Sequence, residues 1–196
     1  MKIYIAVFCF LFFLPLSAQE TWELKKDKND IKIYTKTIDS TKLKAYKAEM
    51  TVKSTLEKVK NIIVDGDELH NWNYKAIDSK LIKKTSESEY TIWMAIDLPW
   101  PLRNRDFASH IRVEVVSKDV IRINLSSASD TYAVQEDYLR MTNFVGYWLL
   151  EKQGDTIKVT NEMYGDPGGS LPNWLINSTI TRAPYYNFKA LRNRVQ

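Results

Sequence analysis

Two histidines, His70 and His110, are the side chains of this chain best suited to act as general bases near neutral pH. An imidazole takes part in catalysis only where it lies within hydrogen-bonding reach of a reacting group. His110 shares the polar face of a predicted strand with Arg112 and Glu114, and His70 lies in a polar connector. We therefore expect both rings to be solvated or hydrogen bonded rather than catalytic.

Other signatures of catalysis or metal binding are missing from the sequence. It contains no His-Glu-x-x-His, no Gly-x-Ser-x-Gly and no Gly-x-x-x-x-Gly-Lys motif. Its single cysteine, Cys9, lies in an apolar N-terminal run, so the rest of the chain has no thiolate nucleophile, disulfide or sulfur ligand. Asp65-Gly66-Asp67 resembles a fragment of a calcium loop without the remaining ligands. We predict no catalytic residue, no metal site and no cofactor.

The first eighteen residues have the pattern of an export signal. Lys2 precedes an uncharged apolar run over 3–16, and Ser17-Ala18 supplies small residues for cleavage before Gln19. The run is short for a transmembrane span, although an uncleaved anchor is the alternative. The sequence therefore predicts a signal peptide at 1–18 and one domain at 19–196. We expect an exported protein, periplasmic or secreted by a bacterium.

The formal net charge of +4 is modest. A mildly basic surface suits transient contact with an anionic membrane, but such a charge more commonly belongs to a solvated surface without a partner. The lysines are scattered through alternating strand patterns rather than gathered in one stripe. We therefore expect no nucleic-acid partner.

Most of the chain alternates apolar and polar residues with the period of a β-strand. Ser54-Thr55-Leu56-Glu57 has the form of a capping box and predicts a helix that runs to Val64. The connections between strands are too short for crossover helices, which indicates an antiparallel meander. Strands are predicted at about 31–36, 43–52, 76–84, 89–98, 106–117, 119–127, 138–151 and 156–165.

The C-terminal region predicts one long helix after a tight turn. Asp166-Pro167-Gly168-Gly169 is turn chemistry in which both glycines are free to adopt positive φ. Ser170 is the expected N-cap of a helix over about 171–194, with Pro172 in its first turn. Pro184 lies inside this span and must kink or break the helix, because it removes a backbone hydrogen bond and clashes with the preceding turn.

Several motifs occur in the order and spacing of a known family. They are Gly165-Asp-Pro-Gly-Gly-Ser-Leu-Pro-Asn-Trp-Leu-Ile-Asn177, Asn71-Trp72-Asn73, Leu98-Pro-Trp-Pro-Leu-Arg-Asn-Arg-Asp-Phe107, Gly146-Tyr147-Trp148 and Leu191-Arg192. Over about residues 21–194 the chain resembles the START domain, the lipid-transfer module of steroidogenic acute regulatory and phosphatidylcholine-transfer proteins. The resemblance implies an α+β helix-grip fold. In that fold a curved antiparallel sheet wraps around a long C-terminal helix and encloses a hydrophobic tunnel for one lipid.

The resemblance also implies which side chains face the tunnel. In the family's Arg-Asp-Phe strand the Arg and every second residue point inward, and the same alternation extends to the neighbouring strands. Carried over to this chain, the implied ligand-binding residues are Ile92, Met94, Ile96, Arg105, Phe107, Ser109, Ile111, Asn161, Met163, Trp174, Ile176, Ile180 and Phe188.

The inward faces depart from the family at one point. Many animal members carry an inward Arg, paired with an acid, at the position of Ile111, whereas here both positions are apolar and Arg112 points away. An unpaired buried Arg would be costly, so its absence agrees with an apolar ligand and speaks against a phosphocholine or ceramide headgroup. Asn161 and Ser109 remain as inward partners for a single hydroxyl or carbonyl.

The loop at 98–107 combines an exposed aromatic with charges. Trp100, between two prolines, either enters a membrane interface or packs against the terminal helix. In the membrane arrangement Arg103 and Arg105 would meet phosphates, which conflicts with an inward Arg105. The adjacent Arg105 and Asp106 either order the tunnel mouth or form an ion pair that joins loop and strand.

Three functions are compatible with this sequence. The first is a non-enzymatic carrier of a hydrophobic lipid or sterol-like molecule. The second is an enzyme like the polyketide cyclases of related folds, which needs inward acid–base residues that the apolar faces do not supply. The third is a ligand sensor that signals to a partner through an exposed apolar patch, to which Trp93 and Trp148 could contribute.

Overall fold

The computed structural model describes residues 21–100, 102–169 and 171–196. The predicted signal peptide and the predicted N-cap Ser170 lie outside these residues. The strands are β1 (Glu23–Lys28), β2 (Ile31–Thr37), β3 (Lys44–Lys53), β4 (Ala76–Ser86), β5 (Glu89–Ile96), β6 (Arg105–Ser117), β7 (Val120–Ser127), β8 (Leu139–Arg140), β9 (Asn143–Gln153) and β10 (Thr156–Asp166). The helices are α1 (Leu56–Val64), η1 (Leu69–Asn71), η2 (Ser129–Thr131), α2 (Asn173–Thr179) and α3 (Arg182–Val195).

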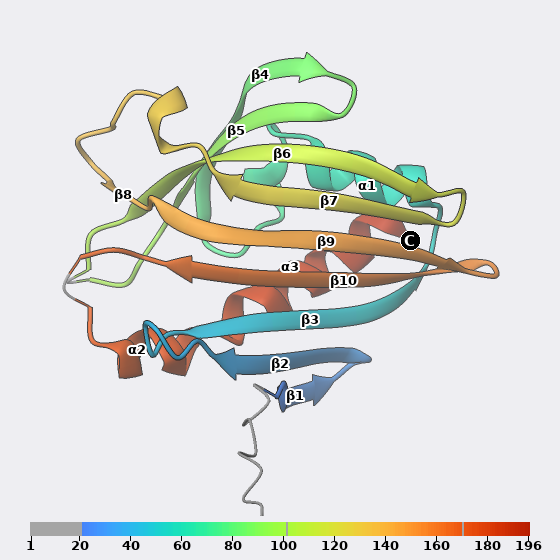
Figure 1. Cartoon of the computed structure of the whole chain (residues 1–196), viewed down its shortest axis with the longest axis horizontal. Helices are drawn as coiled ribbons and strands as arrows, with labels where there is room; N and C mark the ends of the chain where they lie inside the picture. Colours follow the sequence, from blue (N-terminus) through green and yellow to red (C-terminus); the bar gives the residue numbers. More distant parts are fainter. Residues whose placement is uncertain (1–20, 101, 170) are drawn as a thin grey trace, which may run out of the picture.

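The strands form one curved sheet with α3 behind it (Figure 1). Their order is β1-β2-β3-β10-β9-β7-β6-β5-β4, so two antiparallel meanders join where β3 pairs with the last strand, β10. The two-residue strand β8 pairs in parallel with β6, outside the meanders. The predicted α+β helix-grip architecture, a curved antiparallel sheet around C-terminal helices, is confirmed.

Two strand boundaries differ from the prediction. The strand β1 was not predicted, because its residues Glu-Leu-Lys-Lys-Asp-Lys are mostly polar and exposed, as befits an edge. The segment predicted as one strand over 138–151 divides into β8 and β9, which pair with different neighbours. In both places the strand boundaries depend on which neighbouring strand the segment pairs with, and the local sequence pattern does not reveal that neighbour.

The first helix begins one residue later than a capping box at Ser54 requires. The N-cap of α1 is Thr55, whose hydroxyl accepts a hydrogen bond from the backbone N–H of Lys58 at 3.2 Å. The Ser54 hydroxyl instead donates to the carbonyl of Val195. Together with a hydrogen bond from the Lys58 Nζ to the same carbonyl, this fixes the end of α3 against the start of α1.

The C-terminal region forms two helices rather than the predicted single one. Pro172 is the N-cap of α2 rather than a residue of its first turn, and the break falls before Arg182, the first residue of α3. Pro184 is therefore in the first turn of α3, where its missing N–H has no intrahelical partner to lose. Gly168 and Gly169 adopt φ of 68° and 75°, so the predicted positive-φ turn is confirmed.

The core lies between the concave face of the sheet and the helices. Phe188 of α3 is fully buried and stacks on Trp148 of β9 at a centroid distance of 5.5 Å. Trp93 is also buried, on the opposite face of β5, where Tyr132 and Tyr138 of the 128–140 loop cover its ring. Neither tryptophan contributes to an exposed apolar patch, which contradicts that part of the sensor hypothesis.

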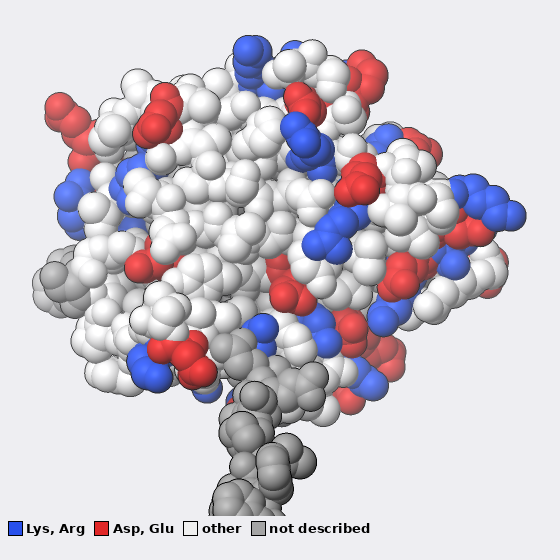
Figure 2. Space-filling model, viewed as in Figure 1, with Lys and Arg blue, Asp and Glu red and all other residues white. Residues whose placement is uncertain are grey.

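Charges of both signs alternate on the face of the molecule in Figure 2, most densely toward the ends of the β6–β7 and β9–β10 hairpins. The surface over the middle of the sheet is mostly uncharged (Figure 2). This face therefore carries no continuous basic stripe.

Candidate functional site

An inner cavity of about 370 Å³ lies between the concave face of the sheet and the two C-terminal helices. The described residues that line it, mostly apolar, come from β3, β5, β6, β7, β9 and β10, from α1 and the connector after it, and from α2 and α3. They are Lys44, Tyr46, Ile63, Leu69, Trp72, Asn73, Tyr74, Ile92, Met94, Ile96, Leu98, Arg105, Phe107, Ser109, Ile111, Leu125, Met141, Phe144, Trp148, Asn161, Met163, Tyr164, Gly165, Pro167, Ile176, Thr179, Ile180, Ala183, Pro184 and Asn187.

The alternation carried over from the family places its residues on the cavity wall. All the strand residues predicted to face inward line the cavity, as do Ile176 and Ile180; the strand residues are Ile92, Met94, Ile96, Arg105, Phe107, Ser109, Ile111, Asn161 and Met163. Trp174 does not line the cavity; this residue of α2 is 72% exposed. Phe188 lies beneath the cavity, packed on Trp148. Contact with a ligand stays a prediction for all of them.

Several lining residues were missed by the sequence analysis. Tyr46 lies on the same face of β3 as the buried Ala48, Met50 and Val52. The period-2 rule applied to that strand would therefore have found it. Trp72 reaches the cavity from the connector between α1 and β4, which has no period to read.

A pair of neutral polar groups lies on the cavity wall. The Tyr46 hydroxyl donates to Asn161 Oδ1 at 2.8 Å, and Asn161 Nδ2 donates to the carbonyl of Tyr147 at 3.0 Å. Burial raises the pKa of Tyr46. The phenol therefore stays protonated, and its oxygen lone pairs can still accept a hydrogen bond from a ligand hydroxyl.

Arg105 is buried at the mouth of the cavity and holds the turn that precedes α2. Its Nε donates to the carbonyl of Pro167 at 2.7 Å, and its guanidinium also reaches the carbonyls of Gly168 and Arg103. Burial, and after it the charge of Arg103, lowers the pKa of Arg105. The inward assignment of Arg105 is thus the correct one, and its role as a phosphate contact is not supported.

Asp106 forms its ion pair with Arg140 and not with the adjacent Arg105, because neighbouring residues of a strand point to opposite faces. Arg140 donates from Nε and Nη2 to the two carboxylate oxygens at 2.9 and 2.7 Å, and both side chains are buried. Arg140 also donates to three carbonyls of the 128–140 loop, those of Ser129, Tyr132 and Ala133. The pair therefore fastens this loop over β5 and β6.

The described lining of the cavity carries no carboxylate and no imidazole. The ring and backbone of His70 both contact the hydroxyl of Ser79, and His110 lies on the opposite face of the sheet. No group of three metal-ligating side chains occurs within 21–100, 102–169 and 171–196. In the same part of the chain, no helix combines the length and the apolar character needed to cross a bilayer.

Three hydrogen bonds attach α2 to the connection between β2 and β3. Asn177 Oδ1 accepts from the backbone N–H of Lys44 at 3.0 Å, and its Nδ2 donates to the carbonyl of Lys42 at 3.2 Å. Asn173 Nδ2 donates to the carbonyl of Thr41 at 3.0 Å. This seven-residue helix has no fully buried residue, and these hydrogen bonds attach it to the end of the β2–β3 hairpin.

Comparison with known proteins agrees with this geometry. A protein of Pseudomonas aeruginosa is 30% identical over 179 residues, covering 90% of this chain and 88% of that protein. The rat phosphatidylcholine transfer protein is 24% identical over 169 residues, covering 83% of this chain and 78% of that protein. The crystal structure of a STAR-related lipid transfer protein from Xanthomonas axonopodis is 28% identical with a TM-score of 0.83, covering 89% of this chain and 98% of that chain.

The family model of the START domain matches residues 3–196. That match spans the sheet, the cavity lining and both C-terminal helices described above. The chain therefore belongs to the START domain family.

Proposed function

We propose that the protein is a non-enzymatic carrier that holds one lipid or sterol-like molecule in the inner cavity and transfers it between membranes. The observation that carries the proposal is the inner cavity itself, a mostly apolar space between the sheet and the C-terminal helices, with Ile176 and Thr179 of α2 in its lining. Its described lining offers no acid–base pair for the cyclase alternative. The membership of the START family supports the binding of a hydrophobic ligand.

The ligand is compact and uncharged in this proposal. A volume of about 370 Å³ lies at the lower end of the roughly 300–1,000 Å³ typical of small-molecule sites. Ile111 stands where many animal family members have an inward Arg. The guanidinium of Arg105 already donates its hydrogen bonds to backbone carbonyls. The Tyr46–Asn161 pair is left to recognise one hydroxyl or carbonyl, which favours a sterol-like molecule over a zwitterionic two-chain phospholipid.

Membrane docking at the cavity mouth completes the carrier mechanism. Trp100 is 91% exposed in the β5–β6 loop, and Trp174 is 72% exposed on α2. The β5–β6 loop and α2 lie at the same end of the sheet (Figure 1), where Leu98 and Ile176 line the mouth. Exposed tryptophans prefer the membrane interface, so both rings would enter the headgroup region while α2 moves aside.

The proposal places the carrier outside the cytoplasm, in a bacterial periplasm or in the medium. Its support is the charged, apolar and small-residue sequence of 1–18. A carrier in that compartment would move a hydrophobic molecule through water between membranes.

The hydrogen bonds that attach α2 to the β2–β3 connection are expected to limit the rate of ligand release. Asn177→Ala removes two hydrogen bonds, together about 1 kcal/mol at a partly exposed site, and should accelerate release about fivefold. Stopped-flow release of a fluorescent sterol to excess vesicles measures this rate. Ser178→Ala is the control, because that hydroxyl bonds only within α2, to the carbonyl of Leu175. Equal rates for the wild type and both variants would show that α2 does not gate the cavity.

Transfer itself is tested with two vesicle populations. Donor phosphatidylcholine vesicles carry a fluorescent sterol, and acceptor vesicles carry a quencher. We expect catalytic amounts of protein to accelerate transfer, and the double variant Trp100→Ala/Trp174→Ala to load the sterol normally but to transfer it more slowly. Stoichiometric extraction without acceleration would instead identify a storage or sensing protein.

A further inference from the structure

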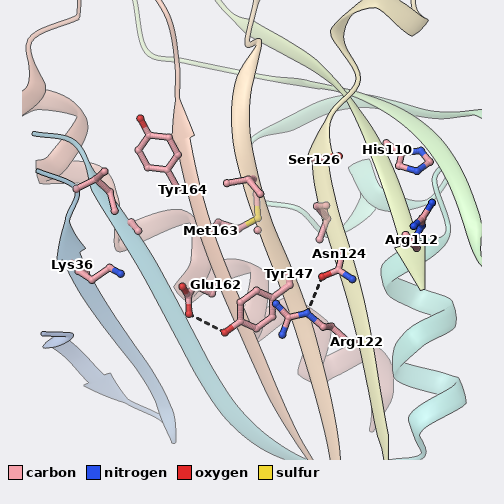
Figure 3. A pocket seen from close by; sticks show the side chains of 15 residues that line it. Lys36, His110, Arg112, Arg122, Asn124, Ser126, Tyr147, Glu162, Met163 and Tyr164 are labelled. Atoms are coloured by element: carbon pink, nitrogen blue, oxygen red, sulfur yellow. Dashed lines mark hydrogen bonds between the residues drawn. The ribbon is translucent and has the colours of Figure 1, made fainter. Parts of the chain in front are cut away.

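A second hollow of about 540 Å³ lies on the opposite face of the sheet from the inner cavity. We call it the outer trough. Its floor crosses β10, β9 and β7, and Lys36 of β2 and Arg112 of β6 stand at its two sides (Figure 3). Nothing in the proposed carrier mechanism uses these side chains.

Strand register explains how the polar residues of the outer trough come together. Tyr147 of β9 lies directly opposite Asn124 of β7 on one side and opposite Glu162 of β10 on the other. All three side chains therefore share the outer face. The Tyr147 hydroxyl donates to Glu162 Oε2 at 2.9 Å, and this carboxylate is thereby partly occupied (Figure 3).

Arg122 is held in one orientation at the centre of this arrangement. Its Nε donates to Asn124 Oδ1 at 2.8 Å, and its Cζ lies 3.7 Å from the centroid of the Tyr147 ring. The Tyr147 ring thus covers one face of the guanidinium, and Asn124 accepts from its Nε; both groups are neutral. The remaining amino groups form the planar fork that binds a carboxylate or phosphate through two hydrogen bonds.

The guanidinium of Arg122 is the feature of the outer trough that attracts an anion. No carboxylate of the described residues forms an ion pair with Arg122, whereas Arg112 at the rim is paired with Glu89 at 2.8 Å. Lys36 and Arg112 also line the trough; the carboxylates nearby are that of Glu162, which accepts from Tyr147, and that of Glu114, which lies opposite Arg122 in the β6–β7 register. Val145, 55% exposed, and the Tyr147 ring offer apolar surface next to these charges.

We propose that the outer trough is a binding site for a small organic anion, whose carboxylate or phosphate is gripped by Arg122 and whose apolar body rests on Tyr147 and Val145. The site is separate from the inner cavity and faces away from it. The site distinguishes carboxylates and phosphates from halide ions, because only the former present two acceptor oxygens to the two donors of the Arg122 fork.

The two hollows are separated only by the thickness of the sheet. Residues Leu125 and Met163 contribute to the lining of both. A methyl group at Gly146 would collide with Met163 Sδ and with the carbonyl oxygen of Glu162, so the wall at this point is built from backbone and one thioether. An anion in the outer trough therefore binds next to the cavity wall without entering the cavity.

Titration calorimetry with phenyl phosphate and with benzoate tests the proposal on the complete mature protein. We expect both probes to bind at millimolar or lower concentration, and Arg122→Gln to weaken binding at least tenfold. Arg194→Gln is the matched control, because this arginine of α3 pairs loosely with Glu68, far from the outer trough in the fold. Arg122→Lys keeps the charge without the fork and should restore only part of the affinity.

Two further measurements distinguish a small-anion site from a membrane contact and from a failure of the carrier function. Vesicles containing phosphatidic acid are compared with free phenyl phosphate; binding to the vesicles alone would make the trough a membrane contact and overturn the small-anion proposal. Equal affinities of the wild type and Arg122→Gln, or no binding of either free probe, would also overturn it. Sterol loading of Arg122→Gln is measured in parallel and should be unchanged, so that failure of this site and failure of the carrier function remain distinguishable.

Discussion

Asp106→Asn should lower the free energy of unfolding by about 3–5 kcal/mol, the usual effect of breaking a buried ion pair. The substitution keeps the shape of the side chain but leaves the Arg140 guanidinium without its counter-ion in a site where Arg140 is only 7% exposed. It also weakens the acceptor of the Trp93 indole N–H, which lies 2.8 Å from Asp106 Oδ2. Urea unfolding followed by tryptophan fluorescence measures the effect.

A second ion pair provides the control for this prediction. Asp97 and Lys75 also lie 2.7 Å apart, but both side chains are substantially exposed, so solvent screens their interaction. Asp97→Asn should leave the urea midpoint unchanged within error. Similar shifts for Asp106→Asn and Asp97→Asn would show that the Asp106–Arg140 pair does not fasten the 128–140 loop.

Ser109→Phe should remove the ligand without unfolding the protein. Ser109 is buried in the wall of the inner cavity on β6, and a phenyl ring at this position would occupy the space assigned to the ligand. We expect the affinity for a fluorescent sterol to fall at least tenfold, equivalent to about 1.4 kcal/mol of binding free energy. Fluorescence titration of the delipidated variant gives this number.

The stability of the same variant tests whether the cavity is empty space. A phenyl ring forced into a filled core costs about 1–3 kcal/mol, whereas a ring that enters a cavity costs little. Thr51→Phe adds the same ring on the outer face of β3 and serves as the control. Strong destabilisation by Ser109→Phe, with sterol binding retained in the fraction that folds, would contradict the location of the ligand.

The sequence was sufficient to predict the curved sheet and one wall of the cavity. Alternation along β5, β6 and β10 places Met94, Phe107 and Met163 on the cavity side, because the period of a strand is fixed once one residue is oriented. That orientation came from the family resemblance and not from periodicity. The absence of an inward charge at Ile111 followed from the same alternation.

The remaining features depend on contacts between distant segments. The C-terminal helix ends after Thr179 and restarts at Arg182, although Pro184 was the expected breaking point, because a proline is tolerated in a first turn. The partner of Asp106 lies 34 positions away on a two-residue strand with no pattern of its own. The outer trough was not predicted, since the proximity of Arg122, Tyr147 and Glu162 follows from the pairing of β7, β9 and β10.

The central claim is that one hydrophobic molecule occupies the inner cavity. Native mass spectrometry of the mature protein, purified from its own host or from a bacterial host and then extracted with organic solvent, tests it most directly. We predict a single additional mass that solvent releases and that is a compact, uncharged lipid or sterol-like compound, absent from Ser109→Phe. A protein that retains its ligand-free mass after incubation with a membrane lipid extract would contradict the claim.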